Sequence, residues 1–270
     1  MYRLLGLSLL SLSLVACATN PVTGRHQLML VSEDTAIAAS SEAYVEMMAP
    51  LKEEGRLNRD PAVNERVRRI TGRLVAQAIK YRPETAKWQW TLNVIDDPGT
   101  VNAFAMAGGK MAVYTGLLEQ VKPTDDELAE VIGHEIGHAL SAHTAEKMSV
   151  ALATDVAVTA VAVASDNHEV ALTGTALAAA LAVQLPNSRQ AEREADRIGI
   201  ELAAKAGYDP YAAITLWQKM DRLGGSRQPQ WLSTHPSPED RMQKLSQLAP
   251  KMMPYYTAPG ERPTFPLPAQ

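Results

Sequence analysis

The sequence of 270 residues contains a single cysteine, Cys17, so no disulfide can form within one chain and a small disulfide-held fold is excluded. Aromatic residues are also scarce, at 5%, so aliphatic side chains and 11 methionines must fill the interior. The chain lacks a basic excess, because 26 Lys and Arg stand against 30 Asp and Glu. Phosphate binding needs a concentrated basic surface, so we expect no nucleic-acid partner. With 46% hydrophobic residues, the chain can still bury a sizeable core.

The N-terminal region lacks a hydrophobic run long enough to cross a membrane. The apolar stretch over residues 4–14 is about half of the roughly 20 residues that a spanning helix needs. It follows a short cationic start, as in a secretory signal peptide. The sequence Leu-Val-Ala-Cys that ends at Cys17 resembles a bacterial lipoprotein processing site, and Ala18 after it resembles a signal for the outer membrane. We therefore expect a signal peptide over 1–16 and a lipid anchor at Cys17 that holds the protein in the bacterial envelope, facing the periplasm.

The rest of the chain predicts one domain, over 32–249, between two less regular ends. Residues 17–31 are expected to form a lipidated, extended lead-in, and the Pro-rich tail over 250–270 is expected to be extended or disordered. Residues 150–183, rich in Ala and Val, predict an α-hairpin packed on the body, with peripheral membrane contact as the alternative. Helical signals mark 32–48, 61–78, 124–147, 189–206, 210–223 and a segment after 238, and strand signals mark 87–95, 101–107 and 110–114.

A metal-binding pattern lies within the predicted helix over 124–147. The sequence HEIGH at 134–138 places two imidazoles on one helix face, since residues four apart lie within about 40° of each other. Two such imidazoles can bind one Zn²⁺, with Glu135 beside the water as a general base. A catalytic zinc needs a third protein ligand. The sequence does not match the ligand spacing of the metzincin family, because Ser141 and Thr144 stand where that family requires Gly and His.

Carboxylates further along the chain are candidates for the missing ligand. Glu192 and Asp196 lie four apart on the predicted helix over 189–206. Glu192 can complete the zinc shell and Asp196 can accept the free N–H of a ligating histidine. The alternative is a solvated charged face. His143 lies about 140° around a continuous helix from His138, so we expect it on the surface or behind a ligand, and not on the same metal.

These motifs resemble the zinc metallopeptidases of family M48, in particular periplasmic lipoprotein members related to the mitochondrial Oma-type peptidases. The resemblance rests first on HEIGH followed by Glu-x-x-Ala-Asp over 192–196, and it spans about residues 20–248. Ala107 departs from it, since many members have proline before the diglycine. Further similar segments are NPVTG at 20–24, NAFA at 102–105, GGK at 108–110, YTGLL at 114–118, AGYDP at 206–210 and THPSP at 234–238, followed by Arg241.

The resemblance implies an α+β, predominantly α-helical, zincin-like fold with a small β-sheet beside the active-site helix. It implies one Zn²⁺ per chain, and it implies that the late His235 either stabilises the oxyanion or occupies the open metal position. The residues that it implies are His134, His138 and Glu192 as metal ligands, Glu135 as the base, Asp196 behind a ligand, His235 and Arg241 as late catalytic residues, and Asn102, Ala103, Phe104 and Ala105 along an extended substrate.

We therefore expect a zinc endopeptidase that acts on unfolded or misassembled envelope polypeptides. Three alternatives remain: a chaperone-like assembly factor that uses the same groove for binding, a zinc hydrolase of another envelope amide, and a pure interaction module. The presence of Glu135 favours catalysis over binding alone. The sequence makes no prediction of the oligomeric state.

Overall fold

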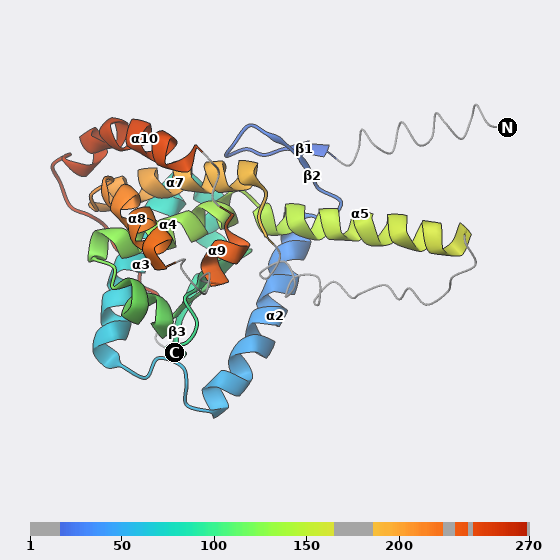
Figure 1. Cartoon of the computed structure of the whole chain (residues 1–270), viewed down its shortest axis with the longest axis horizontal. Helices are drawn as coiled ribbons and strands as arrows, with labels where there is room; N and C mark the ends of the chain where they lie inside the picture. The colour runs from blue at the N-terminus through green and yellow to red at the C-terminus, as the bar shows by residue number, and fades with distance from the viewer. Residues whose placement is uncertain (1–16, 165–185, 224–229, 237–239, 269–270) are drawn as a thin grey trace.

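The computed structural model describes residues 17–164, 186–223, 230–236 and 240–268, and most of these residues are helical (Figure 1). The helices are α2 (Glu33–Glu53), α3 (Pro61–Tyr81), α4 (Asp125–Leu140), α5 (His143–Ala164), α7 (Arg189–Ala206), α8 (Ala212–Leu223), α9 (Gln230–Thr234) and α10 (Arg241–Tyr256), with short turns η1 (Pro83–Lys87) and η2 (Leu117–Val121). The strands are β1 (Cys17–Thr19), β2 (His26–Leu28), β3 (Thr91–Ile95), β4 (Ala103–Met106) and β5 (Lys110–Tyr114). This confirms the expected α+β fold, predominantly helical with a small sheet.

The central sheet has the strand order β3-β5-β4. β3 is parallel to β5, whereas β4 and β5 form an antiparallel hairpin. The hairpin turn places Gly108 and Gly109 at φ 77° and 78°, which glycine adopts without strain. β4 therefore lies at an edge of the sheet. The strand expected over 87–95 begins only at Thr91, because Lys87 still belongs to η1 and residues 88–90 form no strand pairing.

The helix that carries HEIGH packs against α7 at glycine positions. A Cβ on Gly199 would lie 2.7 Å from the His134 backbone N, and a Cβ on Gly137 would lie 2.9 Å from the Ala195 carbonyl oxygen. Only glycine permits so close an approach of two helix backbones. Both helices begin where the sequence predicts, with the capping box of Thr124 and Glu127 at the start of α4 and Ser188 as the N-cap of α7.

The helix expected over 124–147 is interrupted, so its predicted end is wrong. α4 ends at Leu140, Ala142 adopts a left-handed φ of 52°, and α5 begins at His143. α5 continues to Ala164 and projects away from the body in Figure 1. The second half of the expected hairpin, over 165–185, lies outside the described residues, as do residues 1–16. No helix in the described part of the chain is long and apolar enough to cross a membrane.

The C-terminal tail is more ordered than its proline content predicts. α10 continues through Pro250 to Tyr256, so the expectation of an extended chain there is wrong. The buried side chains of Leu245 and Ala249 hold this helix on the body, which outweighs the low helix propensity of proline. Beyond it, the backbone N–H of Phe265 donates to the Gly72 carbonyl at 2.9 Å.

Candidate metal centre

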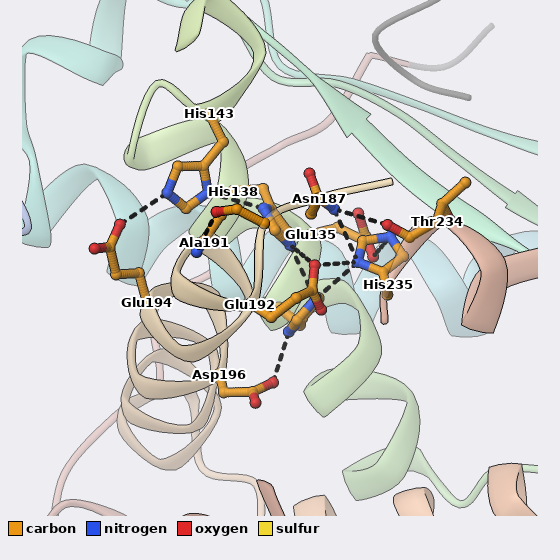
Figure 2. A network of polar contacts seen from close by, with 12 residues as sticks. Glu135, His138, His143, Asn187, Ala191, Glu192, Glu194, Asp196, Thr234 and His235 are labelled. Atoms are coloured by element: carbon orange, nitrogen blue, oxygen red, sulfur yellow. Dashed lines mark hydrogen bonds and ion pairs between the residues drawn. The ribbon is translucent and has the colours of Figure 1, made fainter. Parts of the chain in front are cut away.

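Four side chains from three parts of the fold converge on one point. α4 supplies His134 and His138, α7 supplies Glu192, and the residue after α9 is His235. One ligand atom from each lies within 4.8 Å of all the others, and none of the four residues is more than 5% exposed. Figure 2 shows Glu192 and His235 pointing toward each other beside His138. The histidine pair and the distant glutamate that the motifs predict are therefore brought together.

The spacing of these atoms fits a tetrahedral zinc ion. The Nε2 atoms of His134 and His138 are 3.0 Å apart, and the Glu192 oxygens lie 3.4 and 3.3 Å from them. Ligands bound at about 2.0–2.1 Å in tetrahedral geometry lie roughly 3.3 Å from one another. Two imidazoles and a carboxylate are also a common zinc donor set.

The electrostatics of the centre favour a cation. Burial would lower the pKa of His134, but hydrogen bonds to Asp196 and Glu192 outweigh it and raise the pKa to about 10. The pKa of Glu192 is held well below its ordinary value: burial opposes this, but His235 and the two ligand imidazoles stabilise the carboxylate. Asp196 and Glu135 add two further carboxylates, and Arg241 contributes one positive charge. A divalent cation compensates this excess of negative charge.

Asp196 and Arg241 lie directly behind the ligands. Asp196 Oδ1 is 2.9 Å from His134 Nδ1, so the other ring nitrogen is left to face the centre. Arg241 donates from Nε to Asp196 Oδ2 at 2.7 Å and from Nη2 to Glu192 Oε2 at 2.6 Å. Its guanidinium lies 3.7 Å from the ring centroid of Trp217, which supports it by a cation–π contact. Arg241 thus fixes two carboxylates of α7 at once.

Glu135 has a hydrogen-bond donor that the motifs do not reveal. The indole N–H of Trp231 on α9 donates to Glu135 Oε1 at 2.8 Å. Trp231 is fully buried and stacks on Trp217, with ring centroids 4.9 Å apart. The spacing of four residues between Trp231 and His235 is the one sequence signal that connects this tryptophan with the site.

His235 occupies the fourth ligand position in this structure. Its Nδ1 lies 3.1 Å from His134 Nε2 and 3.1 Å from Glu192 Oε1, and its Nε2 lies 3.3 Å from Glu135 Oε1. Asn187 supports this placement, because its side-chain amide is 3.3 Å from His235 Nδ1 and donates to the Thr234 carbonyl at 3.2 Å. Of the two roles that the resemblance implies for His235, this geometry matches occupation of the metal position.

A narrow cavity of about 30 Å³ opens beside the centre. Phe104 and Ala105 of β4 line it together with Glu135 and His138, whereas Asn102 and Ala103 are not among its lining residues. The remaining lining residues are His143, Thr144, Lys147, Asn187 and His235. Burial lowers the pKa of Lys147 to about 8.

His143 lies behind His138, where it contacts the ligand imidazole from outside the centre. The two Nδ1 atoms are 2.8 Å apart, and His143 Nε2 is 3.0 Å from Glu194 Oε2 (Figure 2). The angle expected for a continuous helix does not apply, because the chain breaks at Ala142 and turns the second ring back toward the first. Neither Ala142 nor Glu194 carries a sequence signal for this contact.

Comparison with known proteins finds a family profile and several metallopeptidases that are similar to the part of the chain that contains these residues. A profile of Peptidase family M48 matches residues 61–249. The bovine protein "Metalloendopeptidase OMA1, mitochondrial" is 34% identical over 246 residues, which is 87% of this chain and 46% of the bovine protein. The "Mitochondrial metalloendopeptidase OMA1" of Schizosaccharomyces pombe is 34% identical over 86% of this chain and 66% of its own length. "Metalloprotease LoiP" of Escherichia coli is 36% identical over 54% of this chain and 57% of its own length. The chain spans about half the length of the first of these relatives.

Proposed function

This chain belongs to peptidase family M48, and on that premise we propose that it is a zinc-dependent endopeptidase of the bacterial envelope that cleaves unfolded or misassembled proteins. The observation that carries the proposal is the position of Glu135. Its carboxylate lies in the same cavity as a ligand imidazole, within reach of His235, and one oxygen is held by an indole N–H. A structural metal site or a binding module has no need of a carboxylate held in this place.

The chemistry divides between the metal and the residues around it. Bound zinc supplies the Lewis acidity that makes water acidic enough to attack a peptide carbonyl near neutral pH. Glu135 accepts the proton from that water and later delivers it to the leaving amine. The indole N–H of Trp231 donates to Glu135 Oε1, so we assign proton transfer to Glu135 Oε2. Arg241 and Asp196 keep Glu192 and His134 in ligating orientation.

Substrate access requires movement of His235. In the arrangement described here this imidazole fills the fourth ligand position, so it must leave before a water or a substrate carbonyl can occupy that position. We propose that an extended peptide then lies along β4, whose outer side has no strand partner in the described sheet. Strand addition uses backbone hydrogen bonds, which are nearly indifferent to side chains. Such recognition suits unfolded polypeptides.

The envelope location is supported by the N-terminal sequence. A cationic start, a short apolar run and Leu-Val-Ala-Cys ending at Cys17 together favour export followed by lipidation. Metabolic labelling with palmitate should mark the wild-type protein and leave Cys17→Ser unlabelled. Membrane fractionation should then place the wild type in the outer membrane, and recovery of both proteins in the soluble fraction would reject the anchor.

The decisive test of the proposed activity compares Glu135→Gln with the wild type. Each protein is assayed for zinc stoichiometry and for cleavage of unfolded casein, with Glu119→Gln, at an exposed carboxylate, as the matched control. We expect one zinc per chain in all three proteins and loss of cleavage in Glu135→Gln alone. Unchanged biological complementation by Glu135→Gln would favour a chaperone-like role. Retained zinc with no casein cleavage by the wild type would favour another envelope amide as substrate.

A further inference from the structure

The lead-in between Cys17 and α2 is built against the end of the metal-binding helix. Asn20 and Gln27 donate side-chain N–H groups to the carbonyl of Ser141, the C-cap residue directly after α4, at 2.8 and 2.9 Å. The Asn20 side chain also accepts the backbone N–H of Val22 at 2.8 Å, which shapes the turn between β1 and β2. Carbonyls at a helix C-terminus lack partners within the helix. The motif NPVTGRHQ therefore satisfies a backbone carbonyl at the C-terminal end of α4, although it contributes no metal ligand.

Arg25 of this motif reaches two acidic residues on different helices. Its Nη1 and Nη2 donate to the two oxygens of Glu146 on α5, both at 2.6 Å. Its Nε donates to Glu194 Oε1 on α7 at 2.7 Å. The side chains of Glu194 and Glu146 are only 8% and 19% exposed, so these charge-assisted bonds are poorly screened by solvent.

The contacts continue from Glu194 to the metal centre without a gap. Glu194 Oε2 accepts from His143 Nε2 at 3.0 Å, and His143 Nδ1 lies 2.8 Å from His138 Nδ1. His138 Nε2 faces the other ligands, so its proton must be on Nδ1, from which it donates to His143. His143 then carries its own proton on Nε2 and donates to the carboxylate. Every hydrogen bond in the series has one donor and one acceptor.

We propose that Arg25 and His143 are positioning residues of the metal centre. His143 contacts His138 directly and Arg25 acts on it through Glu194 and His143, and together they fix the ring orientation and tautomer of His138 and thereby set the affinity for the metal. The inference rests on the proposed function, since it takes His138 as a zinc ligand. The segment that follows Cys17 would then support a metal ligand, in addition to connecting the domain to the lipid anchor. His134 is held by a separate pair, Asp196 and Arg241, so the two ligand histidines have independent supports.

The test measures zinc affinity, by competition with a chromophoric chelator, in the full chain purified in detergent. The variants are Arg25→Ala, the conservative Arg25→Lys, His143→Phe, which retains a ring without nitrogens, and the double variant of Arg25→Ala with His143→Phe. Arg59→Ala is the matched control, because Arg59 pairs with Asp96 at 2.6 Å while its side chain is 67% exposed. The melting temperature of each metal-free protein is measured in parallel.

We expect Arg25→Ala and His143→Phe each to weaken zinc binding about 10- to 100-fold, as loss of a group behind a metal ligand does. Arg25→Lys should lose less, and Arg59→Ala should stay within about twofold of the wild type. The double variant should bind no more weakly than the weaker single variant, because both changes break one series of contacts.

Two results would overturn the inference. One is zinc affinity of Arg25→Ala within about twofold of the wild type, with only the metal-free melting temperature lowered, which means a purely structural role. The other is a double variant whose loss equals the product of the two single losses, which means independent effects. The Arg25 comparison holds even if His143→Phe does not fold. A wild-type protein that binds no zinc would instead refute the proposed function itself.

Discussion

The packing of α4 on α7 makes a counterintuitive prediction for Gly199→Ala. In an exposed helix interior this substitution stabilises, because alanine exceeds glycine in helix propensity by about 1 kcal/mol. Here the new Cβ would lie 2.7 Å from the backbone N of His134 and 2.9 Å from the carbonyl carbon of Gly133. Both contacts are backbone atoms, which cannot rotate aside. We therefore expect the substitution to destabilise the protein.

The size of the effect follows from the distances. An ordinary Cβ contact begins at 3.4 Å, so the two helices must separate by about 0.7 Å. Overpacking of this kind costs about 1–3 kcal/mol. After the gain of about 1 kcal/mol in helix propensity, the net loss of stability is about 0–2 kcal/mol. Glu192 lies two turns earlier on the same helix, and metal–ligand distances tolerate only about 0.2 Å. The shift should therefore weaken zinc binding at least about tenfold.

Zinc competition and thermal unfolding of the metal-free protein together test this reasoning. Gly99→Ala is the control, because its Cβ would meet only the Asp97 side chain, at the ordinary distance of 3.4 Å. The control should match the wild type in both assays. If Gly199→Ala raises the melting temperature and leaves zinc affinity unchanged, the helix contact does not set the ligand geometry and the reasoning is wrong.

Three further predictions concern other parts of the site and of its helix. Trp231→Phe keeps an aromatic ring but removes the N–H donor to Glu135. A hydrogen bond to a charged group is lost, so kcat/KM for casein should fall about 10- to 100-fold at unchanged zinc content. A kcat/KM equal to that of the wild type would show that the donor is dispensable. In Arg241→Lys a single ammonium group replaces the planar guanidinium and cannot bind both carboxylates in the same geometry, so zinc affinity should fall about tenfold. Zinc affinity equal to that of the wild type would mean that the two carboxylates keep their positions without this bridge. Burial would raise the pKa of Glu127, but hydrogen bonds from a lysine, a backbone N–H and a threonine leave it below 4.5. This carboxylate therefore adds stability above pH 4.5 that is lost as the pH falls through its folded-state pKa. Urea unfolding of the metal-free protein should show Glu127→Gln converging with the wild type in acid, and a stability difference that does not change with pH would contradict the assignment.

The helix faces that carry the ligands were predictable because their signals are local, whereas the meeting of the two faces at one metal was implied by the resemblance to family M48. Two histidines four residues apart must share a helix face, and the carboxylates at 192 and 196 must share another, whatever the rest of the fold does. The expected helix start at 124 and helix end at 206 are also confirmed, because Thr124 and Gly207 cap those ends by local geometry. Each of these inferences needs only the geometry of a single helix.

The contacts that support the ligands were not predictable, because they join distant segments. Ala142 adopts a left-handed backbone conformation that directs His143 toward His138. An alanine at this position gives no sequence signal for that conformation. Trp231 reaches Glu135 across 96 positions of sequence. The helix through Pro250 likewise depends on packing, because local propensity alone argues against it.

Two sets of supporting contacts share one feature: arginines from opposite ends of the chain bind the carboxylates of α7. Arg25, ahead of the first long helix, binds Glu194, and Arg241, at the start of the last helix, binds Glu192 and Asp196. α7 carries the third ligand, so its position decides whether that ligand can meet the two histidines of α4. Charge-assisted bonds from both ends order these carboxylates before any metal arrives. Zinc binding then need not supply the free energy of ordering them, which is how a preorganised site reaches high affinity with few ligands.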